Sequence, residues 1–233
     1  MQPEFSTRTT TMSAGAAAAP AAQKVLRNTY LLLAMTLLTS AVTAGIAMLA
    51  HIPHGVGLVS SLVALALLWF AVPRTAHSAA GIGVVFAITA LLGFGLGPVL
   101  EHYLSLANGA QIVMLALGLT AIAFVGLSAY ALTSRRDFGF MRSFLFAGVL
   151  VAFIAGLVSL VAALLGYPLP ALALTVSALF AVLMCGMILY QTGEIVNGGE
   201  TNYVLATIGL YVSLYNLFTS LLHLLGAFMG ERD

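Results

Sequence analysis

One stretch decides the fold of this chain: Leu189–Ser220, which reads LYQTGEIVNGGETNYVLATIGLYVSLYNLFTS. It leads into the most polar of the long apolar runs, Tyr203–Met229, which is long enough to cross a bilayer. On a helix of 3.6 residues per turn, the polar side chains of this run gather on two neighbouring stripes. They are Thr207, Tyr211, Ser213, Tyr215, Asn216, Thr219, Ser220 and His223. Because such groups are costly against hydrocarbon, we expect other helices to surround this one.

Composition places the chain in a membrane. Its 233 residues are 61% hydrophobic and 6% charged, whereas charged residues make up about 25% of a typical soluble domain. A net charge of +1 without a basic patch gives no reason to expect nucleic acid as a partner. The single cysteine, Cys185, rules out an internal disulfide. We therefore expect an all-α integral membrane protein in contact with membrane lipid.

Seven apolar runs predict seven transmembrane helices, the seventh central and enclosed by the other six. The predicted spans are Leu31–Ala50, Val56–Val72, Ala79–Leu100, Gln111–Thr133, Phe144–Leu165, Pro170–Tyr190 and Tyr203–Met229. Pro98 is expected to distort or end the third span. Residues 1–23 are rich in Ser, Thr, Ala and Gly and are expected to form a mobile cytoplasmic tail, which leaves residues 24–233 as the transmembrane domain.

Cations alternate between the connections. They are Lys24 and Arg27 before the first span, Arg74 after the second, and Arg135, Arg136 and Arg142 after the fourth. By the positive-inside rule these segments and the amino terminus are cytoplasmic. Seven spans then place the carboxyl terminus on the opposite side of the membrane.

The sequence excludes several kinds of membrane enzyme and pump. No predicted span has an acid in its interior, which removes the usual proton or cation relay. Histidines, cysteines and acids do not occur at zinc-binding spacing, so we expect no metal site and no cofactor. One enzymatic alternative stays open, because Ser128 in the sequence GLSA and His223 resemble the serine and base of a rhomboid protease. A serine beside small residues is more often a packing residue, and we expect no catalytic residue and no enzyme.

The candidate functional groups lie around the connection before the last span. Glu194 and Glu200 are its two acids, and Arg74 is a potential partner that would latch the cytoplasmic side. The simpler interpretation of Arg74 is an anchor at the membrane interface. For Ser213 and Asn216 the simpler interpretation is interhelical hydrogen bonding without a role in transport.

A loop motif within this connection predicts a turn followed by a helix start. The motif comprises Gly198, Gly199, Glu200, Thr201, Asn202 and Tyr203. The glycine pair accepts a positive φ without penalty, which suits a tight turn. Thr201 or Asn202 is then placed to cap the first N–H groups of the last helix, and an acid favours the positive end of that helix.

These residues resemble the Bax inhibitor family, in its bacterial YccA-like branch. The matching segments are Ile188–Tyr190, Thr192, Gly198–Tyr203, Ala206–Thr207 and Leu210–Asn216, with Lys24–Tyr30, Ser128–Tyr130 and Leu132–Thr133 earlier in the chain. The resemblance covers nearly the whole chain after residue 23. It implies a central seventh helix enclosed by the other six, in a bacterial inner membrane, with a cytoplasmic amino-terminal tail. The carboxyl terminus, which the span count places on the opposite side, is then periplasmic.

The resemblance also implies two activities. Members of the YccA-like branch modulate the membrane AAA protease FtsH, which can engage their cytoplasmic amino-terminal tail. Other members of the family are pH-sensitive calcium leak channels, gated by a hydrogen-bonded pair of aspartates. We expect this chain to be a non-enzymatic modulator of FtsH, and the alternative is a calcium or other cation leak channel with an altered gate.

The gate is altered because neither aspartate is present. Gln191 and Ser213 stand at the two expected positions, where they can hydrogen-bond but do not titrate near neutral pH. Glu194, one turn beyond Gln191, is a weak substitute with Arg74 as its partner. Glu194 and Glu200 are likewise weak candidates for contacting a calcium ion.

Overall fold

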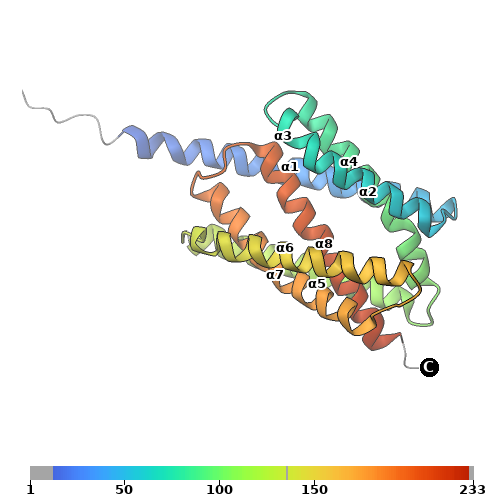
Figure 1. Cartoon of the computed structure of the whole chain (residues 1–233). Coiled ribbons are helices and arrows are strands. Elements are labelled where there is room, and N and C mark those ends of the chain that lie inside the picture. The colour runs from blue at the N-terminus through green and yellow to red at the C-terminus, as the bar shows by residue number, and fades with distance from the viewer. Residues whose placement is uncertain (1–12, 135, 231–233) are drawn as a thin grey trace, which may run out of the picture.

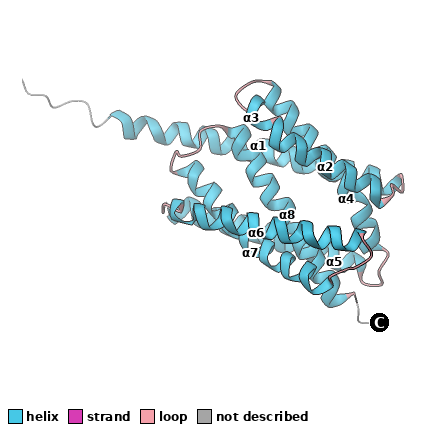
Figure 2. Ribbon diagram, viewed as in Figure 1, coloured by secondary structure: helices cyan, strands magenta, loops and turns pink. Residues whose placement is uncertain are grey.

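A computed structural model of the chain describes residues 13–134 and 136–230, and these ranges are helical with connecting turns (Figures 1 and 2). The elements are α1 (Ser13–Leu49), α2 (His54–Phe70), α3 (Val72–Thr75), α4 (Ala80–Leu104), α5 (Gly109–Ser134), the short 3-10 helix η1 (Gly139–Met141), α6 (Arg142–Leu164), α7 (Pro170–Val196) and α8 (Tyr203–Met229).

The chain is a multi-pass membrane protein. Six helices, α1, α4, α5, α6, α7 and α8, are long and apolar enough to cross a bilayer. The shorter apolar helix α2 has 17 residues. At about 1.5 Å per residue it is roughly 25 Å long, close to the lower limit for a span. The expected count of seven spans therefore reduces to six clear candidates and the shorter α2.

The first helix begins earlier than the sequence pattern indicates. Because α1 starts at Ser13, residues 13–23 of the expected tail are helical, and residues 1–12 lie outside the described residues. The alanine-rich segment favours a helix, and continuity with the first span removes the cost of nucleating it separately. Figure 1 shows the start of α1 extending beyond the other helices.

The last helix, α8, runs between two groups of helices (Figure 1). It packs against α1 and α4 on one side and against α5 and α7 on the other. No residue from Tyr203 to Ala227 is exposed, as its polar stripes require. Enclosure by all six other helices is not confirmed, because α2 packs on α4 and α6 packs on α7.

Small residues allow the close approach of α1 and α4. A side chain on Gly93 would overlap the backbone of Ser40, and one on Gly97 would overlap Ala44 and Ala47. Both glycines are buried and lie one helical turn apart, so they form a GxxxG contact surface. Pro98 follows directly and α4 continues to Leu104, so of the two expected effects, distorting or ending the third span, the second does not occur. The distortion stays a prediction.

A polar network at mid-span joins α8 to this helix pair. The Ser40 hydroxyl donates to the Thr89 carbonyl at 2.6 Å and also contacts the Tyr211 hydroxyl. Since Ser40 has one proton, it accepts the proton of Tyr211 while it donates to Thr89. Tyr211 is 1% exposed. The hydroxyl of this α8 residue is therefore satisfied inside the bundle.

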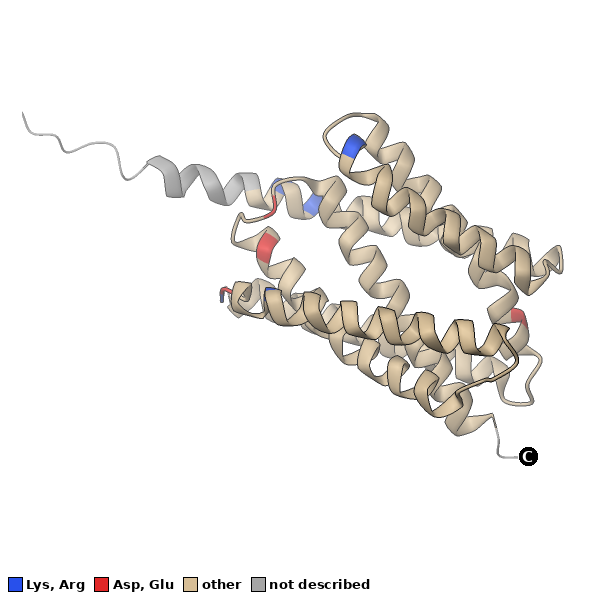
Figure 3. Cartoon of the chain, in the orientation of Figure 1, with Lys and Arg blue, Asp and Glu red and all other residues tan. Residues whose placement is uncertain are grey.

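Charge is concentrated at one end of the bundle (Figure 3). The cations there are Lys24, Arg27, Arg74, Arg136 and Arg142, and the acids are Asp137, Glu194 and Glu200. Glu101 lies at the opposite end, where its Oε1 is 2.6 Å from Nδ1 of His51. The described cations therefore lie at one end of the bundle, as expected if cation-bearing and cation-free connections alternate along the chain.

Candidate functional site

The connection between α7 and α8 begins with a tight turn that requires glycine. The helix α7 continues to Val196, six residues beyond the predicted end, so the connection is shorter than expected. Gly198 has φ +78, in the left-handed region. The N–H groups of Gly199 and Glu200 then donate to the Glu194 carbonyl at 2.8 and 3.1 Å. The glycine pair therefore forms the predicted turn and closes the end of α7.

Asn202 fixes the start of α8. Its Oδ1 accepts hydrogen bonds from the N–H groups of Val204 at 2.9 Å and Leu205 at 3.3 Å, so Asn202 is the cap that the motif predicts. Its Nδ2 donates to the Ala76 carbonyl at 2.8 Å. Glu200 Oε1 in turn accepts from the Asn202 N–H at 2.7 Å. The loop motif thereby connects α8 to the segment between α3 and α4.

Gln191 and Ser213, which stand at the two positions that the family resemblance singles out, meet between α7 and α8. The Ser213 hydroxyl lies 3.2 Å from Gln191 Oε1 and 3.1 Å from the Gly209 carbonyl oxygen, two acceptors for its one proton. Ser213 is 2% exposed. Both side chains of this pair are neutral. Gly209 lies so close to Gln191 that a side chain at position 209 would press on the Gln191 amide.

A cavity of about 290 Å³ lies next to Gln191, at the charged end of the bundle. It is lined by the side chains of Arg142, Tyr190, Gln191, Glu194 and Glu200 among others. Two carboxylates and one guanidinium leave a formal charge of −1 at its wall. Within the described ranges, no group of three or more His, Cys, Asp or Glu side chains is arranged to hold a metal ion.

Arg74 and Asn216 do not make the contacts that were considered for them. The side chain of Arg74 is exposed and donates to the carbonyl of Phe70, four residues earlier at the end of α2. It therefore does not pair with Glu194 or Glu200. Its position at the charged end fits the simpler interpretation, an anchor at the interface. Asn216 Nδ2 donates to the Val212 carbonyl at 2.8 Å, one turn earlier on α8 rather than on another helix.

The arrangement of Ser128 and His223 excludes the rhomboid alternative. Ser128 lies near the carboxyl end of α5, where its hydroxyl is 3.5 Å from that of Thr192. His223 lies near the opposite end of the bundle, where Nδ1 is 2.8 Å from the Ser177 hydroxyl. A general base must be within hydrogen-bond reach of its nucleophile, and these two side chains contact different partners.

Two participants in this site were not predicted from the sequence. Arg142 was assigned only to a cytoplasmic connection, but it lines the cavity beside Glu194 and Glu200. The Ala76 carbonyl, which accepts from Asn202, lies more than a hundred residues earlier in the chain. Neither contact has a local sequence signal, since each depends on how distant helices pack.

Residues 22–230 match the family described as "Inhibitor of apoptosis-promoting Bax1". The chain belongs to the Bax inhibitor family. Within this family it is 46% identical over 210 residues to the "Modulator of FtsH protease YccA" of Escherichia coli K12, which covers 90% of this chain and 92% of the relative. It is 45% identical, with the same coverage, to an uncharacterized membrane protein of Vibrio cholerae. An uncharacterized relative from Pseudomonas aeruginosa is 43% identical over 89% of this chain and 90% of its own length.

Proposed function

We propose that this chain modulates an FtsH-type membrane protease in a bacterial inner membrane. The observation that carries the proposal is the 46% identity, over 90% of the chain, to the Escherichia coli relative named as a modulator of FtsH. Another Escherichia coli relative with the same identity is named as an inner membrane protein. The site geometry supports a role through contact, because the polar groups around α8 fix helices to one another rather than forming a nucleophile–base pair.

The proposed orientation places the charged end in the cytoplasm. The described cations lie at this end (Figure 3), and Figure 1 shows α1 starting on the same side. The positive-inside rule then assigns the amino terminus to the cytoplasm, and seven crossings, with α2 as the short one, assign the carboxyl terminus to the periplasm. An FtsH-type protease would meet the amino-terminal segment on the cytoplasmic side.

Reconstitution with the protease tests this role. The full chain, an FtsH-type protease and a labelled membrane substrate are combined in vesicles, and substrate loss is followed with time. Deleting residues 2–23 is expected to remove the effect on the degradation rate while the spans still insert, because residues 24–49 of the first span remain. Replacing residues 2–23 by a Gly-Ser segment of equal length separates loss of sequence from loss of length. An unchanged degradation rate with the deleted chain would contradict the proposal.

A calcium or cation leak is the second candidate function. The cavity of about 290 Å³ favours it, since Glu194 and Glu200 give its wall a net negative charge at the proposed cytoplasmic mouth. Calcium would be a transported ion there, because two carboxylates alone do not provide the six to eight oxygen ligands of a resident site.

Calcium flux into dye-loaded vesicles tests the second function. If the carboxylates attract the ion, Glu194→Gln lowers the flux and Thr201→Ala, an exposed change in the same loop, does not. Flux that is equal in the Glu194→Gln variant and the wild type would remove these carboxylates from any conduction path.

A further inference from the structure

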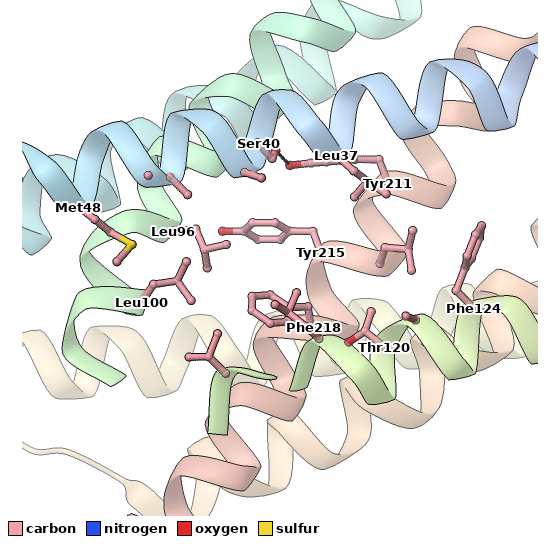
Figure 4. A pocket seen from close by; sticks show the side chains of 17 residues that line it. Leu37, Ser40, Met48, Leu96, Leu100, Thr120, Phe124, Tyr211, Tyr215 and Phe218 are labelled. Carbon is pink, nitrogen blue, oxygen red and sulfur yellow. Dashed lines mark hydrogen bonds between the residues drawn. The ribbon is translucent and has the colours of Figure 1, made fainter. Parts of the chain in front are cut away.

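A second cavity lies away from the loop site, between α1, α4, α5 and α8. Its volume is about 480 Å³ (Figure 4). The α1 wall combines the small residues Ser40, Ala44 and Gly45 with the larger side chains of Leu37 and Met48. The α8 wall includes Leu214 and Phe218, which are 5% and 7% exposed. Figure 4 shows the ring of Tyr215 pointing across the cavity from α8.

The cavity reaches the lipid-facing surface. The helices α1 and α5 meet through the rings of Tyr30 and Phe124, whose centroids are 5.8 Å apart, and each packs mainly on other helices, α8 among them. Leu37 of α1 and Leu117 of α5 line the cavity and are 39% and 53% exposed. All four surrounding helices are clear span candidates. The opening therefore lies between α1 and α5, at the level of the hydrocarbon.

The lining chemistry selects an apolar occupant. No charged side chain lines the cavity. The hydroxyls of Ser40 and Tyr211 contact each other, and the Thr120 hydroxyl donates to the Ala116 carbonyl at 2.7 Å. A buried water needs two to four polar partners. Apart from Tyr215, whose ring points across the cavity (Figure 4), the lining hydroxyls are already paired. Small-residue faces of membrane helices normally receive another helix. Ser40 and Ala44 pack on α4 in this way, whereas Ala41 is exposed and a side chain on Gly45 would meet nothing within 4 Å.

We propose that one acyl chain of a membrane phospholipid enters between α1 and α5 and occupies this cavity, against Leu214 and Phe218 of α8. In a bilayer the acyl chain gains no hydrophobic free energy by this move, so its preference comes from van der Waals contacts with the side chains that line the cavity. The bound chain would fill the space that keeps α1 and α5 apart. This inference does not rest on the proposed role with a protease.

Photo-crosslinking tests the site directly. The purified full chain is placed in vesicles of phosphatidylethanolamine and phosphatidylglycerol that contain a phosphatidylethanolamine with a diazirine in its acyl chain, and the labelled residues are identified by mass spectrometry. Lipids of the surrounding annulus reach exposed residues such as Leu38 and Ile122, at 66% and 71% exposed. Only a chain inside the cavity reaches Leu214 and Phe218, so label on these two residues is the expected result.

Two plug variants and one matched control make the test specific. A side chain on Gly45 meets nothing within 4 Å, and Gly118, which does not line the cavity, is equally open. Gly45→Leu, and independently Ala121→Leu from the α5 wall, are expected to lower the label on Leu214 and Phe218 roughly tenfold, while Gly118→Leu leaves it unchanged.

Three outcomes would overturn the proposal. The first is label confined to exposed residues, and the second is equal label on Leu214 and Phe218 in the plug variants and the control. A parallel experiment uses a free fatty acid that carries the same diazirine. Label on Leu214 and Phe218 from the fatty acid alone, without label from the phospholipid, would assign the cavity to a different lipid class and is the third outcome.

Discussion

Replacing Asn202 should separate two contributions of one side chain. Its Oδ1 caps α8, and its Nδ2 donates to the Ala76 carbonyl 2.8 Å away. Asn202→Ala removes both interactions. Asn202→Asp keeps an oxygen that accepts from the Val204 and Leu205 N–H groups but loses the amide donor. Thr201→Ala changes the exposed neighbouring residue and is the matched control.

The magnitudes follow from the two hydrogen-bond types. Loss of an N-cap costs about 1 kcal/mol, and loss of a partly buried hydrogen bond costs about 1 kcal/mol more. Asn202→Ala should therefore lower the free energy of unfolding by about 2 kcal/mol. Asn202→Asp should lower it by about half as much, because the cap remains, and Thr201→Ala should stay within about 0.5 kcal/mol.

Reversible unfolding in mixed detergent micelles measures these differences. Trp69, the single tryptophan, lies near the carboxyl end of α2 and reports unfolding by its fluorescence, and helix content reports it independently. A value for Asn202→Ala equal to that of Thr201→Ala would refute the assignment of Asn202 as the connection between α8 and the α3–α4 segment. An Asp variant as unstable as the Ala variant would instead refute the contribution of the cap.

Three further substitutions test the packing of the bundle in the same unfolding assay. Gly93→Ala should cost about 2 kcal/mol, because the new methyl group overlaps the backbone of Ser40, whereas Gly118→Ala on an open helix face should cost nothing measurable. Tyr211→Phe should cost about 1 kcal/mol, since the Ser40 hydroxyl then loses its buried donor. Gly198→Ala should cost about 1 kcal/mol, because φ is +78 at this residue.

The sequence predicted which segments are helical better than where they end. Hydropathy ended the sixth span at Tyr190, because Gln191, Thr192 and Glu194 are polar. The helix continues since these residues are held by neighbours: Thr192 is fully buried, and Gly193 lies against the ring of Phe138. Hydropathy reports the edge of the hydrocarbon, whereas the end of a helix depends on contacts beyond that edge.

Enclosure of α8 by six helices was a different kind of inference. Polar stripes predict that α8 is buried, and this follows from the cost of exposing hydroxyls to lipid. They do not determine which helices cover it. Gly57 of α2 lies against Gly95 and Pro98 of α4, and Gly148 of α6 lies against Leu183 of α7, so both outer helices use their small residues on other partners. Such pairing depends on complementary surfaces, which a single sequence does not reveal.

The candidate site was predictable where local rules apply. Gly198 follows from the need for a positive φ, and Asn202 from the preference of helix starts for a side-chain acceptor. The contact of Gln191 with Ser213 came from the family resemblance. Arg142 was missed because its approach to the cavity depends on how α6 packs on α7.

The neutral contact between Gln191 and Ser213 bears on both proposed functions. An amide and a hydroxyl keep the same protonation state across the physiological pH range, so this contact cannot open or close in response to protons. The two nearby carboxylates stand at the charged end, where Glu200 accepts a hydrogen bond from the loop backbone and Glu194 packs on Gly199. The described polar groups thus fix the α7–α8 connection to its neighbours. A fixed connection suits a protein that acts by presenting a surface, because such a protein needs no pH-dependent movement of its last helix.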